Sequence, residues 1–409
     1  MQSPITWIRH NQELVVLCGA TFLVMAGQGV VSPIIPLYAS DFGVSATMVG
    51  LTLTVFAFAR LILNVPAGLI ADRYGRRVLL VGGPVLTAIG MFGSGQADGI
   101  WVLLAWRFVA GAGSAFYMSG AMTYLIDIAP PEKRTRYVAT NQWALSVGVA
   151  LGPGVGGLIA DAYSLSTPFT VVAVLAVVTS IYAAFRLPET RDRALEEQAA
   201  AEAAPPVSTW AFVRSTPFLL VGLSTMTIFM TRAGTRGTLM PLHASEVLGW
   251  GPAEVGLVFT LTGLLTLTTL LPAAWAADHI GRRSVVLFSG VFAGLGAVLA
   301  GSLATPFGFV LGNIVMSLGT GTAGPAPAAY VADIAPPGRR GMAIAMYRSA
   351  GDVGFLAAPP LLGLLSEVTS IGFTLGIGGA LAAVGGIVFF VGSLGDHRAG
   401  KSPVAPHPT

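Results

Sequence analysis

The sequence predicts an all-α membrane protein whose twelve transmembrane helices form two six-helix bundles. Three observations support this fold class. The 409 residues are 54% apolar and only 10% charged, whereas about a quarter of an ordinary soluble domain is charged. Apolar runs of about 20 residues follow one another along the chain, and each can cross a hydrocarbon core of about 30 Å as a helix. Finally, motifs of the first half recur in the second half.

Short connections with charged, proline or glycine residues separate the expected helices. The first apolar run leads directly into this pattern, so we expect it to be a retained helix and not a cleaved signal. The predicted spans are residues 14–38, 46–70, 77–97, 100–126, 136–160, 168–186, 216–241, 252–276, 284–304, 307–331, 342–366 and 372–394.

The basic residues predict the orientation of the chain. Seventeen of the 22 Lys and Arg residues lie in connections or termini on one side, and none lies in a connection on the other. By the positive-inside rule, both termini and the loop at 187–215 are cytoplasmic. We expect a multi-pass protein of a bacterial inner membrane. Its parts are an N-terminal bundle (1–186), a linker (187–215), a C-terminal bundle (216–396) and a tail (397–409).

Composition also bounds the chemistry. The net charge is +3, but the basic residues follow the membrane sides and form no patch, so we expect no nucleic-acid partner. A single cysteine, Cys18, excludes an intrachain disulfide, and the five histidines lack metal-ligand spacing. The sequence has no phosphate-binding loop and no nucleophile elbow. We therefore expect no cofactor, no metal and no enzymatic activity.

An internal duplication is the clearest pattern in the chain. Residues 71–72 and 75–77 recur at 277–278 and 281–283, and Tyr124 with residues 127–131 recurs as Tyr330 with residues 333–337, all at an offset of 206. Gly148, Pro153 and Gly157 recur at the same offset as Gly354, Pro359 and Gly363. Two parallel six-helix repeats follow, an arrangement that places a central cavity between halves that can rock against each other.

The turn at 68–77 resembles the signature loop of the major facilitator superfamily, and the resemblance extends over the whole chain. In that family the loop latches one conformation. The resemblance implies that Asp72 bridges to the opposite half and that Arg73 or Arg76 pairs with Asp127. The alternative is that these arginines only fix topology. The implied latch residues are Gly68, Asp72, Arg73, Gly75, Arg76 and Asp127, with Asp278, Gly281, Arg282 and Asp333 in the second copy.

Further motifs resemble the twelve-span drug:proton antiporter branch of this family. Arg107 begins a pattern associated with proton coupling, although Ala110 replaces the usual Gln, and Pro33 and Pro36 form an element common in exporters. Span 5 resembles the antiporter motif, although Asn141 stands where an upstream Gly is usual. Close helix packing alone is the alternative explanation of its glycines. The motif consists of Gly148, Gly152, Pro153, Gly156 and Gly157.

Charges inside the spans are the most informative imbalance. Away from the span ends there are five arginines but one acid, Asp352, and each charge costs about 2.5–3.5 kcal/mol near mid-bilayer. We expect Arg60, Arg107 and Arg232 to make the cavity positive and to favour a carboxylate or phosphate group. The alternative is a purely structural role, in which Arg348 and Asp352 form an ion pair and the other arginines cap carbonyls or reach toward the outer interface.

Candidate residues follow from these arguments. Proton coupling is assigned to Asp352, Arg107 and Arg348, with Asp352 as the carboxylate carrier. The predicted substrate cavity contains Gln28, Arg60, Arg107, Asn141, Gln142, Trp143, Arg232, Arg236, Asn313 and Tyr347. Intramembrane Asn, Gln, Trp and Tyr side chains often serve only packing, which is the alternative for those residues.

The leading functional hypothesis is a proton-coupled secondary transporter that exports a small organic or amphiphilic compound by alternating access. Rivals are an organic-anion symporter or facilitator, a lipid flippase, and a non-transporting receptor on the same scaffold, although a receptor should lose the latch loops. Expected partners are an anionic or amphiphilic small molecule, protons and membrane lipids, with the protein acting as a monomer.

Overall fold

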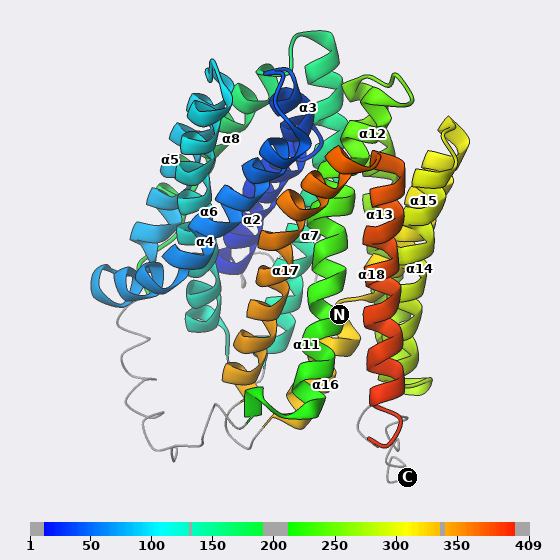
Figure 1. Ribbon diagram of the computed structural model, residues 1–409. Coiled ribbons are helices and arrows are strands. Elements are labelled where there is room, and N and C mark those ends of the chain that lie inside the picture. Colours follow the sequence, from blue (N-terminus) through cyan, green and yellow to red (C-terminus); the bar gives the residue numbers. More distant parts are fainter. Residues whose placement is uncertain (1–11, 131–132, 191–211, 336–339, 397–409) are drawn as a thin grey trace. The chain divides into compact units, whose positions relative to one another are not determined.

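The computed structural model describes residues 12–130, 133–190, 212–335 and 340–396. All regular elements of this part are helices, and Figure 1 shows their arrangement. The N-terminal half contains α2 (Gln12–Val31), α3 (Ile34–Ser40), α4 (Ala46–Tyr74), α5 (Arg76–Gly95), α6 (Ile100–Ile128), α7 (Arg134–Ala162) and α8 (Thr167–Arg186). The C-terminal half contains α11 (Thr216–Met230), η2 (Thr231–Leu239), α12 (Met240–Glu246), α13 (Pro252–His279), α14 (Arg282–Ser302), α15 (Pro306–Thr322), α16 (Pro325–Ile334), α17 (Arg340–Val368) and α18 (Ile371–Gly392).

These elements confirm the predicted fold class. Twelve stretches of the described chain are long and apolar enough to cross a membrane. Three of them are composite: α2 with α3, the run α11–η2–α12, and α15 with α16. Pro33 lies at the break within the first span, where its ring removes one backbone donor. Several spans run past the predicted ends, as in Thr216–Glu246, because their terminal turns are polar and escape a hydropathy criterion.

Two compact units divide the helices. Unit 1 covers the described residues within Met1–Val44, Leu51–Ala204 and Trp250–Thr260, and unit 2 covers those within Ser45–Gly50, Pro205–Gly249 and Leu261–Thr409. Each unit therefore includes the first turns of one helix whose remainder belongs to the other unit. The predicted linker and tail lie largely outside the described residues, so the predicted domain boundaries stay predictions.

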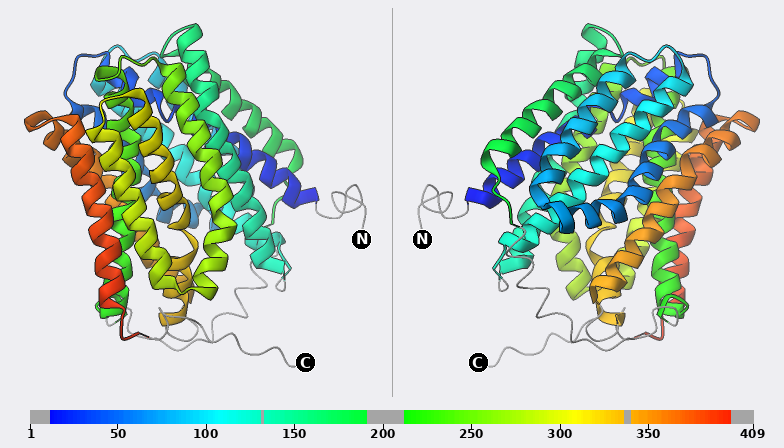
Figure 2. Two further views of the ribbon diagram at one scale, coloured as in Figure 1. Left: turned by 90° about the vertical axis from the view of Figure 1, so that its right-hand side faces the viewer. Right: turned by 90° about the vertical axis from the view of Figure 1, so that its left-hand side faces the viewer.

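Equivalent repeat positions pack together in both units. In unit 1, α2 packs against α7, and α5 packs against α6 and α8. In unit 2, α11 and η2 pack against α17, and α14 packs against α15 and α18. Figure 2 gives two further views of the helices, in which the colours follow the sequence. Helices that lie 206 residues apart in the chain thus have equivalent packing partners. This supports the duplication as a structural repeat.

Four glycines carry the only positive φ angles in the described chain, and they form two repeat pairs. Gly43 and Gly249 both have φ of 67°, whereas Gly75 has φ of 97° and Gly281 has φ of 112°. Residues with a Cβ rarely adopt these angles, so glycine is required at the turns. The turn between the second and third spans therefore has the same backbone form in both repeats.

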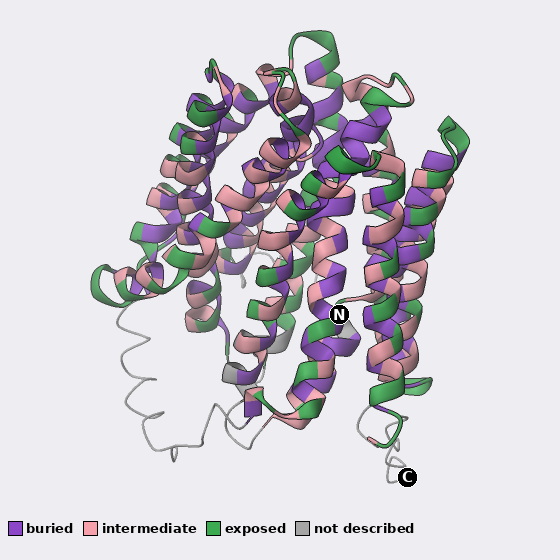
Figure 3. Ribbon diagram, viewed as in Figure 1, coloured by how far each residue is buried: buried purple, intermediate pink, exposed green. Residues whose placement is uncertain are grey.

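The helix surfaces carry many exposed apolar side chains, which is the reverse of a soluble protein. Val65, Leu69, Leu271 and Phe185 are each exposed by two thirds or more. Figure 3 shows buried and exposed positions on opposite sides of single helices. Such faces are stable only against lipid, because that much contiguous apolar surface is rare on water-facing proteins.

Candidate functional site

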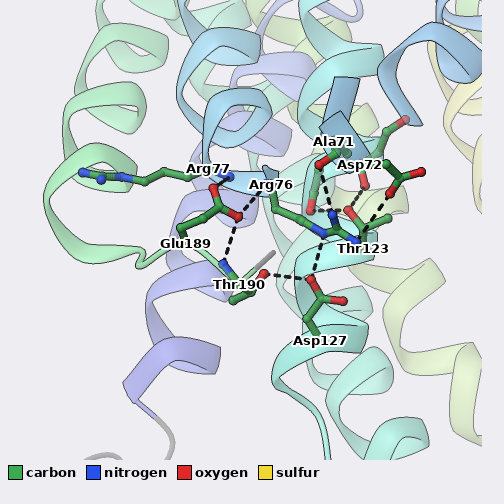
Figure 4. A network of polar contacts seen from close by, with 10 residues as sticks. Ala71, Asp72, Arg76, Arg77, Thr123, Asp127, Glu189 and Thr190 are labelled. Carbon is green, nitrogen blue, oxygen red and sulfur yellow. Dashed lines mark hydrogen bonds and ion pairs between the residues drawn. The ribbon is translucent and has the colours of Figure 1, made fainter. Parts of the chain in front are cut away.

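The first latch joins the turn between α4 and α5 to the end of α6 (Figure 4). Arg76 Nε donates to Asp127 Oδ2 at 2.9 Å, and Arg76 Nη1 donates to the carbonyl of Ala71 at 3.0 Å. Asp72 lies 3.5 Å from Arg76 Nη2. The Arg76 and Asp127 side chains are only 5% and 6% exposed. Of the two arginines proposed for Asp127, Arg76 is the one that contacts it.

Glu189 and Thr190, which follow α8, complete this network. The Glu189 carboxylate accepts from the backbone N–H of Arg76 at 2.9 Å and of Arg77 at 3.1 Å. Thr190 Oγ1 donates to Asp127 Oδ2 at 2.8 Å. Gly75, at the N-cap of α5, has no side chain to satisfy the first N–H groups, so a carboxylate from elsewhere does it.

Sequence reasoning missed these two residues because it assigned 187–215 to a tether. The available signal was an acidic residue shortly after the end of a span, on the same predicted membrane side as the basic turn. The remaining first-latch residues make looser contacts. Arg73 is exposed and its guanidinium lies 5.3 Å from the ring of Tyr74, and Gly68 has open space where a Cβ would stand.

The second latch repeats the pattern in a more exposed setting. Arg282 Nη1 contacts Asp333 Oδ2, and these side chains are 14% and 41% exposed. Asp278 is exposed, and Gly281 takes the N-cap position of α14. The acid of the second copy is therefore much closer to water than the acid of the first.

The glycines of the antiporter-type motif in α7 use one face against α2. A Cβ on Gly152 would lie 2.5 Å from the Cα of Gly29, and one on Gly148 would lie 2.6 Å from a backbone oxygen of α2. A Cβ on Gly156 would collide with the carbonyl of Val30. Only glycine allows the two helices to approach this closely.

The other face of the same motif meets the first turns of α13, all within unit 1. A Cβ on Gly157 would lie 3.1 Å from the Cα of Gly256, and the backbone at Pro153 faces Gly256 in turn. The N–H of Gly154 donates to Thr260 Oγ1 at 2.7 Å. One motif thus fixes two helix contacts.

Arg107 lies among side chains of α4 and α5. It is 2% exposed, and its Nε donates to the carbonyl of Thr52 at 3.3 Å. Its guanidinium lies 4.5 Å from the ring centre of Phe56, a cation–π distance. Arg60 follows Phe56 by one turn on the same face of α4 and is half-buried. Arg107 therefore contacts the same face of α4 on which Arg60 lies.

The two arginines of span 7 lie in a π-helical segment, η2. Arg232 Nη2 donates to the carbonyl of Thr320 on α15 at 2.7 Å, and Arg236 Nη2 donates to Thr262 Oγ1 on α13 at 2.8 Å. The guanidinium of Arg232 also lies 5.4 Å from the ring of Phe229. Arg232 and Arg236 are four residues apart, a spacing that would put them on one face of an α-helix but does not do so in a π-helix.

On α17, Tyr347 is buried, Arg348 is exposed, and Asp352 is half-buried one turn later. Gln28 Nε2 donates to Ser114 Oγ at 3.4 Å, and the fully buried Asn313 donates to the carbonyl of Phe309 in its own helix. The α7 side chains predicted for the cavity, Asn141, Gln142 and Trp143, range from half-buried to exposed. Within the described residues, the latch sets are brought together, while the cavity candidates divide between the two units.

No group of three or more His, Cys, Asp or Glu side chains in the described part of the chain could hold a metal ion. The arrangement contains helix contacts, charge pairs and half-buried ionisable side chains. Such features suit binding and conformational change.

The twelve apolar spans and the twofold repeat define a multi-pass membrane transporter. The family model described as Major Facilitator Superfamily matches residues 17–237 and 223–408, and the chain belongs to this superfamily. Its relatives include an uncharacterized MFS-type transporter of Methanocaldococcus jannaschii, 22% identical over 93% of this chain and 98% of the relative. Multidrug resistance protein 1 of Bacillus subtilis is 23% identical over 88% of this chain and 91% of the relative. Quinolone resistance protein NorA of Staphylococcus aureus is 23% identical over 62% of this chain and 64% of the relative. Two of these relatives are therefore named for drug resistance.

Solved structures show the same fold. A bacterial homolog of the human lysosomal transporter Spinster, in an inward-facing and occupied conformation, matches with a TM-score of 0.79 at 13% identity, over 97% of this chain and 99% of that one. The human organic anion transporter MFSD10 matches with a TM-score of 0.66 at 17% identity, over 95% of this chain and 100% of that one.

Proposed function

We propose that this protein is a proton-coupled secondary transporter that exports a small organic or amphiphilic compound across a bacterial inner membrane. The observation that carries this proposal is the two-faced glycine motif of α7, which resembles the antiporter motif. The names of the relatives from Bacillus subtilis and Staphylococcus aureus support export of drug-like compounds. The distribution of basic residues supports cytoplasmic termini, and in this proposal the transporter acts as a monomer.

Alternating access requires that latches form and break as the two repeats tilt. In this proposal, the Arg76–Asp127 pair and the Arg282–Asp333 pair serve as the two latches. Both stand directly beside a glycine whose positive φ makes a tight turn, so a small backbone change moves the charged groups together. The energy for the cycle comes from the proton gradient, since we find no nucleotide-binding loop.

Asp352 is the proposed proton carrier. It is the acid that lies away from the ends of the predicted spans, and it is half-buried on α17 one turn after Arg348. A tilt of α17 would change its separation from Arg348 and its access to water, and thereby its proton affinity. Arg107, buried against Phe56, is proposed to keep a fixed positive charge near this pathway.

A second candidate function, transport of an organic anion, is favoured by the arginine surplus. Arg232 and Arg236 direct two guanidinium groups from η2 toward carbonyl and hydroxyl oxygens, and both side chains are half-buried. A carboxylate or phosphate on the substrate would supply better acceptors than these neutral oxygens. A pump for cations would be expected to hold acids at such positions.

Counterflow in proteoliposomes with an imposed pH gradient separates the candidates. Export coupled to protons predicts substrate movement against the inward proton flow, and a symporter predicts movement with it. Asp352→Asn should abolish the response to the gradient while leaving exchange at equal pH. Arg232→Gln should weaken transport of anionic compounds at least about tenfold, the loss of one charge-assisted contact worth roughly 1.5–3 kcal/mol.

Arg136→Gln is the matched control, because Arg136 is an exposed arginine at the start of α7 and outside the proposed cavity. Unchanged anion transport in the Arg232 variant would reject the anion assignment without touching the exporter proposal. Movement of fluorescent phospholipids, without transport of soluble compounds, would replace the exporter proposal with a lipid flippase.

A further inference from the structure

His243 is a buried histidine that the proposed transport machinery does not use. It lies on α12 in the last turns of span 7 and is 2% exposed. Its ring is near parallel to that of Phe309 on α15, with the ring centres 6.3 Å apart. Neither ring nitrogen has a hydrogen-bond partner among the described residues. Unsatisfied buried polar groups are rare in proteins, so each one calls for an explanation.

The first repeat holds a satisfied side chain at the same place. Residues 36–40 and 241–245 match in sequence, so Tyr38 is the counterpart of His243. Tyr38 Oη donates to the carbonyl of Ala97 at 3.1 Å, and its ring packs on Phe169 at 5.1 Å between centres. The two repeats thus share an aromatic contact here, but the second has replaced a bonded hydroxyl by an imidazole without bonds.

The helices of the described part of the chain that pack on α12 bring no carboxylate to the His243 ring. The neighbours of α12 are η2 and α18, with Phe309 from α15. Neither α15 nor α18 contains a titratable residue, and η2 contributes only Arg232 and Arg236. Glu246, on α12 itself, is exposed. A proton on His243 would therefore create a buried cation to which these elements bring no counter-charge.

We propose that His243 is a second proton-responsive group of the transporter, whose protonation releases α12 from α15. The packed arrangement accommodates a neutral ring and opposes a charged one. A protonated ring is stabilised where it reaches water, so acid shifts the population toward a conformation with α12 displaced. This inference rests on the proposed proton coupling and adds a pH-responsive contact to span 7. Histidine suits the role because its free pKa is about 6.5.

The test measures how accessible α12 is as a function of pH. Ala244→Cys, at a fully buried position next to His243, is introduced after Cys18→Ser removes the native thiol. Maleimide labelling is followed from pH 5.5 to 7.5 in this protein and in the same protein carrying His243→Phe. The ratio of the two rates at each pH removes the intrinsic pH dependence of the thiol reaction.

We expect this ratio to rise as pH falls, by up to about tenfold per pH unit, which is the limit for one linked proton. His243→Tyr introduces the side chain that the first repeat uses, and it serves as the second variant should Phe disturb folding. The ratio of its labelling rate to that of His243→Phe should stay constant with pH. Tyr38→Phe is the matched control in the first repeat and should leave the rise unchanged.

A ratio that stays constant across the pH range would overturn the inference. So would gradient-driven transport whose pH profile is identical in the native protein and in both His243 variants. Failure of the broader proposal looks different: transport by the native protein would then ignore an imposed pH gradient, whatever the labelling shows.

Discussion

The sharpest expectation concerns the two latch acids, which occupy equivalent repeat positions in different surroundings. Asp127→Asn keeps the shape of the side chain but removes its charge, leaving the Arg76 guanidinium buried beside Asp72 at 3.5 Å. Breaking a buried ion pair by removing one partner costs about 3–5 kcal/mol. The new amide oxygen can still accept one hydrogen bond, which returns about 0.5–1.5 kcal/mol. The net loss is therefore about 2–4 kcal/mol.

Asp333→Asn is the matched control, because its pair with Arg282 is 41% exposed on the acid side. Exposed pairs contribute about 0–1 kcal/mol. Thermal unfolding of the purified protein in detergent measures both, since 1 kcal/mol shifts the Tm by about 2–4 °C for a unit of about 200 residues. We expect a fall of about 5–15 °C for Asp127→Asn and of at most about 4 °C for Asp333→Asn. Equal shifts would refute the argument that burial, and not charge pairing alone, sets the strength of each latch.

Two further expectations follow from the contacts of α5 and α7. Gly156→Ala should prevent accumulation of folded protein, because its Cβ would collide with the carbonyl of Val30, whereas Gly82→Ala, which has open space, should be tolerated; size-exclusion profiles of the two variants compare them. Glu189→Gln should lower the free energy of unfolding by about 1–2 kcal/mol, because the carboxylate that accepts two N–H groups of α5 becomes an amide with one acceptor oxygen. An unchanged Tm in Glu189→Gln would show that water satisfies those N–H groups equally well.

The fold was predictable because a membrane imposes one strong constraint on sequence. Every span needs about 20 apolar residues, and the duplication pairs the spans without any knowledge of contacts. The turn glycines were also visible, since Gly75 and Gly281 recur within one motif. The resemblance limited the partner of Asp127 to Arg73 or Arg76. Which of the two contacts it depends on which side chain the turn directs inward.

Other features escaped for identifiable reasons. The π-helix of span 7 changes the hydrogen-bond register without changing apolar content, so hydropathy is blind to it. Its residues, Thr231–Leu239, include three threonines and two glycines, which weaken the α-helix, and this was the available signal. Glu189 and Thr190 were hidden because their partners are distant in sequence: Glu189 accepts from backbone N–H groups of α5, and Thr190 donates to the Asp127 carboxylate. Composition reveals neither contact.

The two repeats retain the same backbone at their turns but differ in what surrounds their polar groups. Asp127 is enclosed and bonded to two side chains, whereas Asp333 stands largely in water. Tyr38 is bonded, whereas His243 is buried without bonds. In each comparison the first repeat has the better satisfied group. Since conformational change proceeds where local stability is lowest, we expect the C-terminal unit to contribute the movements that respond to protons and substrate, with the N-terminal unit as the more rigid partner.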